Sequence, residues 1–190
     1  ASFPIYSACD LISKQNSNNQ IVVHELKDLL LEGESYIPPR PHRHTFYQIL
    51  YIEKGAGNHK IDFLEHDISS PVIYFLAPGQ VHDLSITDEN SSGCLINFNQ
   101  DFFSSFLNKS QCIDQLPLFS FNRSVSYYQI PKEDVHKFKE IFIKIKNLGE
   151  EKGRISENLI RIYLLELFYT ILNKISDSDE NPNITNQKNI

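Results

Sequence analysis

Several classes of protein are excluded by what this 190-residue sequence lacks. No apolar run approaches the roughly 18 to 20 residues that a membrane span needs. Residues 1–15 have neither a basic segment nor a continuous apolar stretch, so they do not resemble a secretory signal. The three cysteines, Cys9, Cys94 and Cys112, are too few and too widely spaced for a disulfide framework or a zinc-binding pattern. We therefore expect a cytoplasmic protein with free thiols and no contact with a membrane.

Clustered positive charge is also missing. The chain has 18 Lys and Arg against 24 Asp and Glu, a formal charge of −6. Proteins that bind DNA gain much of their affinity by neutralising phosphates with grouped Lys and Arg, so we expect no DNA binding by this chain alone. The sequence also has no nucleophile elbow, no phosphate-binding glycine loop and no paired catalytic carboxylates. It therefore offers no motif of the common hydrolytic or phosphate-handling enzymes.

Short β-strands dominate the first hundred residues. Five stretches are rich in β-branched and aromatic residues, and Gly, Pro and Ser turn signals separate them. Regularly spaced strands with few helices between them predict an antiparallel barrel or sandwich. The predicted strands cover residues 20–24, 45–53, 58–64, 71–77 and 93–99.

Helices are predicted to follow the strands. A short helix is expected over residues 100–107. A longer one follows Pro131, because apolar residues then recur at helical spacing up to Leu148. Residues 149–153 form a break, and Ser156 is the expected N-cap of a second long helix that runs to about Ile175.

The second long helix is unusually apolar. Its apolar residues cover roughly 220° of the circumference, whereas a surface helix needs a stripe of only about 100°. Either its own domain buries it on two sides, or one side contacts a second copy of the chain. We expect a homodimer, since a terminal helix in a domain of this size is rarely enclosed so fully. The residues expected at the dimer contact are Ile160, Leu164, Leu167 and Ile171.

Two histidines one residue apart begin the long aromatic strand. Side chains alternate along a strand, so two faces are predicted. One carries His42, His44, Phe46, Gln48, Leu50 and Ile52, and the other carries Tyr47, Ile49 and Tyr51. Both faces are apolar and must be covered. In a barrel, one would line the interior and the other would pack beneath the C-terminal helices.

The spacing of these residues resembles the two cupin motifs. His42, His44, Gln48 and Gly55 follow the first motif, with Gln48 where a metal-binding cupin has Glu, and Gly79 with His82 follow the second. Tyr36 and Ile86 depart from the usual Gly and Asn.

Three roles for the histidines remain open on this pattern. They could be hydrogen-bonded residues at the barrel rim. They could form a metal site made by His42, His44, Gln48 and His82. Third, they could line a pocket for a small organic ligand. The ligand-binding residues expected in that pocket are His42, His44, Phe46, Gln48, Tyr74 and His82.

Residues 41 to 103 as a whole resemble the N-terminal sensor domain of AraC-type transcriptional regulators. The resemblance is carried by "PHRHTFYQILYIEKG", the "IDF" step and "FLAPGQVH", and it continues weakly into the C-terminal helices. It implies a mainly β fold, a cupin-like (jelly-roll) antiparallel β-barrel followed by two C-terminal α-helices.

The resemblance also implies a domain organisation and a role. A ligand-binding barrel is expected over residues 1–115, a helical dimerisation segment over 116–175, and a polar linker over 176–190, leading toward a helix-turn-helix DNA-binding domain absent from this chain. The preferred hypothesis is an effector-binding, dimeric sensor without catalysis or cofactor, which contacts DNA only through that further domain. The rival hypothesis is a small metal-dependent cupin enzyme, a dioxygenase or an isomerase.

Overall fold

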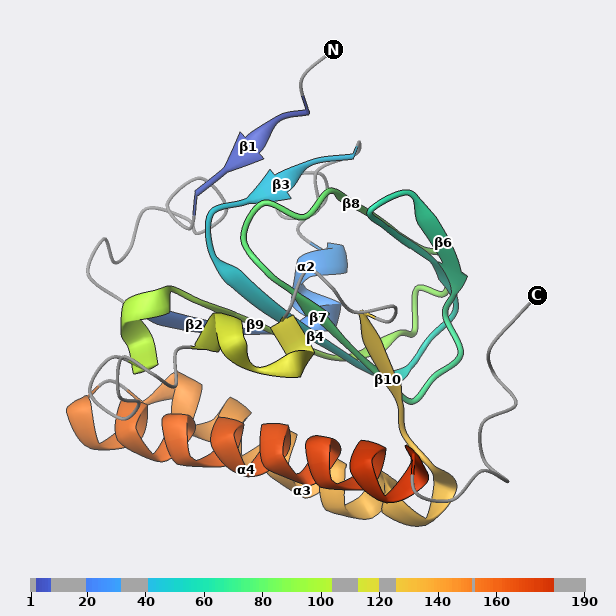
Figure 1. Cartoon of the computed structure of the whole chain (residues 1–190). Helices are drawn as coiled ribbons and strands as arrows, with labels where there is room; N and C mark the ends of the chain where they lie inside the picture. The colour runs from blue at the N-terminus through green and yellow to red at the C-terminus, as the bar shows by residue number, and fades with distance from the viewer. Residues whose placement is uncertain are drawn as a thin grey trace.

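Two antiparallel sheets and a pair of long helices form three layers in the computed structural model of the chain (Figure 1). The structure describes residues 3–7, 20–31, 41–103, 113–119, 126–151 and 153–179. The helices cover one face of the larger sheet, and the smaller sheet lies over the other face (Figure 1). This is the mainly β, cupin-like architecture with two C-terminal helices that the sequence predicts.

The larger sheet has five strands in the order β10-β7-β4-β9-β2. Its strands are β2 (Ile21–Glu25), β4 (Tyr47–Lys54), β7 (Val72–Leu76), β9 (Ser92–Phe98) and β10 (Tyr127–Gln129). The smaller sheet has the order β6-β5-β8, from β5 (Gly57–Ile61), β6 (Leu64–Asp67) and β8 (His82–Ile86). A parallel pair, β1 (Ile5–Tyr6) with β3 (Arg43–His44), lies at one end.

The remaining elements are helical. The long helices are α3 (Val135–Glu150) and α4 (Arg154–Asp179), and a short helix, α2 (Leu26–Leu31), follows β2. Single 3-10 turns are η2 (Gln100–Phe103), η4 (Ile113–Gln115), η5 (Pro117–Phe119) and η6 (Lys132–Asp134). None of the helices in the described ranges is both long enough and apolar enough to cross a membrane.

The alternation of β4 produces two separate cores, as the sequence predicts. Leu50 and Ile52 pack in the core between the two sheets, which we call the intersheet space. Ile49 and Tyr51 pack in the core beneath the helices, with Phe142 among their neighbours. Because successive side chains of a strand point to opposite faces, β4 contacts the intersheet space on one side and the helix layer on the other.

Helix α3 follows its predicted pattern. Phe138, Ile141, Phe142 and Ile145 are buried. The Phe142 ring stacks on Tyr51 of β4 with centroids 4.1 Å apart and planes 6° apart. At the end of the helix, a Cβ on Gly149 would lie 2.8 Å from the Val23 Cβ, so the small residue permits close contact between α3 and β2.

Helix α4 corrects the predicted dimer contact. The four residues expected at that contact are only 0 to 2% exposed in the single chain, because they belong to the core beneath the helices: Ile160, Leu164, Leu167 and Ile171. These side chains are therefore unavailable to a second copy in this conformation. The exposed apolar residues of α4 are different ones, and they include Ile155, Leu159, Ile162 and Tyr169.

The ends of two elements also differ from the predictions. Helix α4 begins at Arg154, so Ser156 lies in its first turn, where its hydroxyl donates to Glu151. The helix continues to Asp179, four residues beyond the predicted end. The short helix predicted for 100–107 is the 3-10 turn η2 as far as Phe103, and residues 104–107 lie outside the described residues.

The predicted strand 58–64 is a hairpin. Asp62 and Phe63 have φ values of 46° and 73° and form the turn between β5 and β6. Two-residue hairpin turns with positive φ usually contain Gly or Asn, so an Asp-Phe pair gives no clear turn signal. Strands β8 and β10 were not predicted, and β10 adds a strand to the sheet from the segment expected to be helical.

Candidate functional site

The candidate site is built around the pairing of His42 with His82. The two residues form an antiparallel bridge, in which each backbone N–H donates to the other residue's carbonyl, over 3.0 and 2.9 Å. Residues directly opposite each other in such a pair carry their side chains on the same face. The sequence motifs, 40 residues apart, are thus brought together by one backbone contact.

Three imidazoles meet at this point. The His42 Nε2 lies 2.9 Å from the His44 Nε2, which lies 3.3 Å from the His82 Nε2. The three rings are 2 to 4% exposed. His42, His44 and His82 each offer one nitrogen, and these atoms all lie within 4.8 Å of one another.

A fourth histidine, His59, extends the cluster, although it was not among the site residues predicted from the sequence. Its Nε2 lies 3.2 Å from the His82 Nδ1, and the residue is fully buried. His59 stands two residues before Ile61 on β5, and Ile61 is buried in the intersheet space. The alternation of β5 was the signal that placed His59 on the inner face. We call His59, His82, His44 and His42 the histidine chain, since successive rings contact one another.

Burial keeps the imidazole rings of His44, His59 and His82 uncharged. The pKa of His44 is lowered to about 3, mainly by burial and also by the neighbouring His42 and His59. Burial likewise lowers the pKa of His59 to about 3, with contributions from His66 and His42. The pKa of His82 is also well below its usual value, mainly because the ring is buried. At neutral pH these three rings are neutral, so each has one nitrogen donor and one nitrogen lone pair.

The other predicted ligand residues also lie on this inner side. The Phe46 ring stacks on His44 with centroids 4.4 Å apart, and Tyr74 contacts the edge of His59 at 4.6 Å. Gln48 is buried but bonds elsewhere: its amide donates to Asn97 Oδ1 over 3.1 Å. Asn97 was not among the predicted residues, and it is found only through the pairing of β4 with β9.

Strand β1 lies over the His42 end of the chain. It pairs with β3, and the Tyr6 ring meets the edge of His42 with centroids 5.4 Å apart. Two further backbone bonds hold this strand, from Arg43 N–H to the Pro4 carbonyl and from Thr45 N–H to the Tyr6 carbonyl. A molecule that approaches the histidine chain from this end would meet β1 first.

The geometry fits a metal ion at three of the rings. In a tetrahedral zinc site with Zn–N bonds of about 2.0 to 2.1 Å, neighbouring ligand nitrogens are about 3.3 Å apart. Two of the three separations, 2.9 and 3.3 Å, are close to this value, and all three nitrogens lie within 4.8 Å of one another. The contact between His82 Nδ1 and His59 would orient the His82 ring, as outer partners of metal-bound histidines do. Gln48 is turned toward Asn97, so three nitrogens rather than four ligands are in place.

The same groups suit an organic ligand with a polar end. Neutral imidazoles and the two amides supply donors and acceptors, while Phe46, Leu50 and Leu76 supply buried apolar walls. A few convergent polar groups within apolar walls are typical of small-molecule sites. Such a ligand would replace the ring-to-ring contacts of the histidine chain with its own hydrogen bonds.

Comparison with solved structures finds matches of low sequence identity. An apo lysine-to-alanine variant of ToxT from Vibrio cholerae strain SCE256 is 16% identical, with a TM-score of 0.48, over 84% of this chain and 58% of that chain. ToxT from Vibrio cholerae O395 bound to (E)-4-(8-methylnaphthalen-1-yl)but-3-enoic acid is 16% identical, with a TM-score of 0.43, over 82% of this chain and 57% of that chain. This chain therefore spans less than two thirds of the length of these structures.

Comparison of sequences gives the family. No curated protein matches the chain. A profile described as the AraC-like ligand binding domain matches residues 32–168, which is more than two thirds of the chain and includes both histidine motifs and both long helices up to Phe168. The chain belongs to the family of AraC-like ligand-binding domains.

Proposed function

We propose that this domain is the effector-sensing and dimerising part of a cytoplasmic AraC-type transcriptional regulator. It binds a small organic molecule at the histidine chain and catalyses no reaction. The single observation that carries the proposal is the two-sided role of β4. This strand leads from the candidate site, and its other face supports the helices.

The path from ligand to helices is short. His44 ends β3, Phe46 directly precedes β4, and Gln48 is the second residue of β4. On the opposite face Tyr51 stacks on Phe142 of α3. A ligand that displaces His44 or Phe46 would shift β4, and so the position of α3 on the sheet. This is allostery only if the ligand binds the two arrangements with different affinity.

DNA binding is assigned to a further domain attached to this one. The chain carries a net charge of −6, which is unsuited to phosphate contacts. Effector binding would then change how two attached domains are placed relative to each other.

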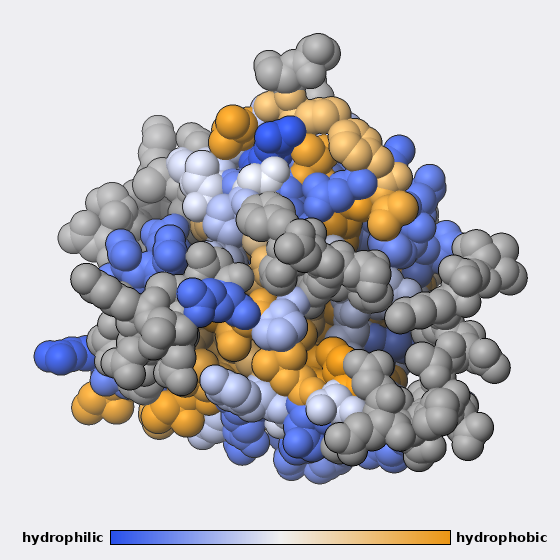
Figure 2. Space-filling view, viewed as in Figure 1, coloured by the Kyte–Doolittle hydropathy of each residue, from blue (hydrophilic) through white to orange (hydrophobic). Residues whose placement is uncertain are grey.

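The dimer contact is now assigned to the exposed side of α4. Ile155, Leu159, Ile162 and Tyr169 are 78, 37, 49 and 53% exposed. Their steps of four, three and seven residues match the seam spacing of paired helices. Figure 2 shows apolar surface at the lower left, over the beginning of α4. We call these four residues the exposed seam.

A thermal-shift assay tests the effector site. The compounds added are monosaccharides, aromatic acids and medium-chain fatty acids. One of these classes should raise the melting temperature of the parent, and His44→Ala should abolish the rise. Tyr128→Phe, a partly buried tyrosine on β10, is the control that should keep it. A rise that survives in both His44→Ala and His82→Ala would place the ligand away from the histidine chain.

The alternative function is that of a metal-dependent cupin enzyme. The distances between the ring nitrogens of His42, His44 and His82 support this alternative, because they are compatible with a bound metal ion. A bound metal would supply a Lewis acid with an open position. Metal analysis of protein purified without chelator separates the two functions. Because Gln48 replaces the usual carboxylate, we expect less than one equivalent of zinc, iron, manganese or nickel. A full equivalent that His82→Ala abolishes would refute the metal-free sensor.

A further inference from the structure

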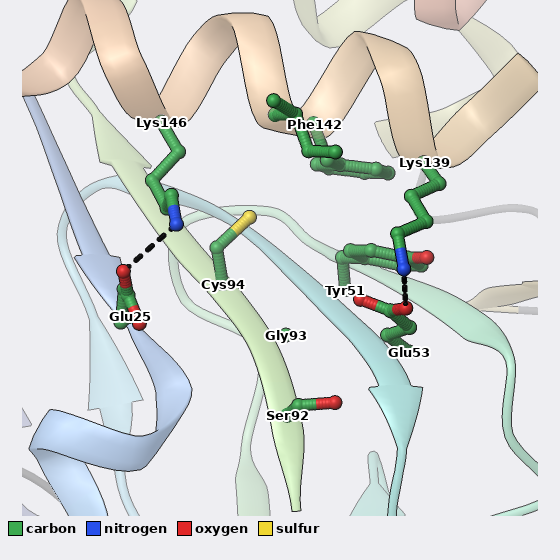
Figure 3. A pocket seen from close by; sticks show the side chains of 10 residues that line it. Glu25, Tyr51, Glu53, Ser92, Gly93, Cys94, Lys139, Phe142 and Lys146 are labelled. Carbon is green, nitrogen blue, oxygen red and sulfur yellow. Dashed lines mark hydrogen bonds and ion pairs between the residues drawn. The ribbon is translucent and has the colours of Figure 1, made fainter.

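A cavity of about 170 Å3 lies between α3 and the outer face of the five-stranded sheet. It is on the opposite side of β4 from the histidine chain, and we call it the helix-side cavity. Figure 3 shows its arrangement: Cys94 and Phe142 lie between Lys146 with Glu25 at one end and Lys139 with Glu53 at the other, and Tyr51 lies toward the Lys139 end.

The floor of the helix-side cavity is buried and uncharged. Tyr51, Cys94 and Phe142 are only 2 to 3% exposed. Burial raises the pKa of the Cys94 thiol to about 12, so the sulfur is a neutral, apolar group at physiological pH. Ile143 and Lys139 at the rim are exposed, so the cavity opens to solvent.

One polar atom on this floor has no partner. The Tyr51 hydroxyl is buried and makes no hydrogen bond within the described residues. Burial and the nearby Glu53 raise the pKa of Tyr51, so the hydroxyl keeps its proton and can both donate and accept. Buried polar groups are nearly always hydrogen-bonded. The unpaired hydroxyl therefore marks a position where a bound molecule would supply the missing partner.

The charges at the rim are already matched. Lys146 forms an ion pair of 2.9 Å with Glu25, and Lys139 forms one with Glu53. The hydrogen bond to Lys146 is the main reason that the pKa of Glu25 is lowered, so this carboxylate stays ionised. A small anion would have to displace a glutamate from its lysine, and a small cation would have to displace a lysine. The rim thus favours a neutral molecule.

The size of the cavity limits that molecule to one or two rings. A protein cavity of about 150 Å3 is large enough to bind benzene. We propose that the helix-side cavity binds a small neutral aromatic molecule, of the size of phenol or indole, whose one polar group hydrogen-bonds the Tyr51 hydroxyl. Bound there, the molecule contacts α3 together with β4 and β9, and so holds the helix on the sheet independently of the histidine chain.

Indole is a suitable probe, because the chain contains no tryptophan and indole fluorescence has no background beyond the tyrosine band. Titration of the parent should give a saturable blue shift of the indole emission, with one site and a Kd of about 0.1 to 1 mM. Tyr51→Phe should weaken binding about 5- to 10-fold, the worth of one hydrogen bond. Tyr128→Phe, which alters a tyrosine outside the cavity, should leave the Kd unchanged.

Two further measurements test the position and the class of the ligand. Cys94→Leu fills the floor with an apolar side chain and should abolish saturable binding, with a retained unfolding transition as the check on folding. Indole-3-carboxylate should bind more weakly than indole. The proposal is overturned if the parent shows no saturable shift, if Tyr51→Phe binds as well as the parent, or if the carboxylate binds more tightly.

Discussion

Histidine protonation decides the stability of the candidate site at the scale of single residues. The histidine chain holds buried imidazoles whose ring nitrogens contact one another. Each ring hydrogen-bonds another ring, which requires one donor and one acceptor in every contact. A proton added to any of them would place a charge in an apolar interior, at a free-energy cost that the unfolded chain does not have.

Acid should therefore destabilise this domain in a defined range. The pKa of His44 and of His59 is about 3 in the folded protein, against an ordinary value of 6.5. Between these values the unfolded chain binds protons that the folded chain does not, so stability rises with pH there. The free energy of unfolding should be constant above about pH 6.5 and should fall by about 1.4 kcal/mol per pH unit for each such histidine below it. Urea unfolding at pH 7.0, 6.0 and 5.0 measures this slope.

Two substitutions test whether the pH dependence of the free energy of unfolding comes from the histidine chain. His59→Leu should remove about one histidine's share of it, whatever its effect on stability at pH 7. His136→Gln, at an exposed position on α3, is the control that should leave the slope as in the parent. A slope unchanged by His59→Leu would contradict the buried, neutral state of this ring.

At the scale of elements, α4 is held mainly by its own domain. Besides its apolar residues, it buries Arg161, whose guanidinium lies over the Phe102 ring at 4.2 Å and donates to Asn158 and Gln20. Arg161 therefore ties the helix to η2 and to the residue before β2. Such anchoring explains how one domain covers so much of an apolar helix.

This packing changes what α4 substitutions should do. Leu164→Ala leaves a void in the core, and the free energy of unfolding should fall by about 2 to 5 kcal/mol. Replacing both Leu164 and Leu167 with Glu should prevent folding, because two carboxylates would be buried without partners. Circular dichroism and urea unfolding measure both effects. A double variant that is a folded monomer would instead restore the dimer contact expected from the sequence.

Assembly is the first property of the whole molecule that the exposed seam predicts. Pairing of two α4 helices about a two-fold axis would bury these apolar side chains. The parent should sediment as a dimer, and Ile162→Glu should shift it to a folded monomer. Ile175→Glu is a matched control, since Ile175 is 40% exposed but lies off the seam. Analytical ultracentrifugation at several concentrations decides; a parent that stays monomeric, or a control that dissociates equally, would exclude the seam.

Lack of DNA binding is a second property of the whole molecule, and the net charge predicts it. With 24 acidic and 18 basic residues, the chain should not retard promoter DNA at physiological salt. An electrophoretic mobility assay at several salt concentrations measures whether the protein retards the DNA. Sequence-specific retardation that weakens as salt rises would mean that a DNA-reading surface lies within this domain.

Much of this protein is determined by patterns that are local in the sequence. The two-faced alternation of residues 46–52 and the apolar stripe of α3 depend on periodicity alone, so both were predictable. The two histidine motifs were visible for the same reason, since their spacing within each strand is local. These features gave the fold class, the helix layer and the residues His42, His44 and His82.

The tertiary structure decided what those patterns contact. Alternation along β5 places His59 on an inner face, but only the pairing of β5 with β8 brings it to His82, and only the pairing of β4 with β9 brings Asn97 to Gln48. The turn at Asp62 and Phe63 lacks the usual residues, so β6 was not predicted. For α4, periodicity showed an apolar circumference but not which side was covered. Burial depends on the neighbours that long-range folding supplies, and here it placed Leu164 and Leu167 inside and Ile155 and Ile162 outside.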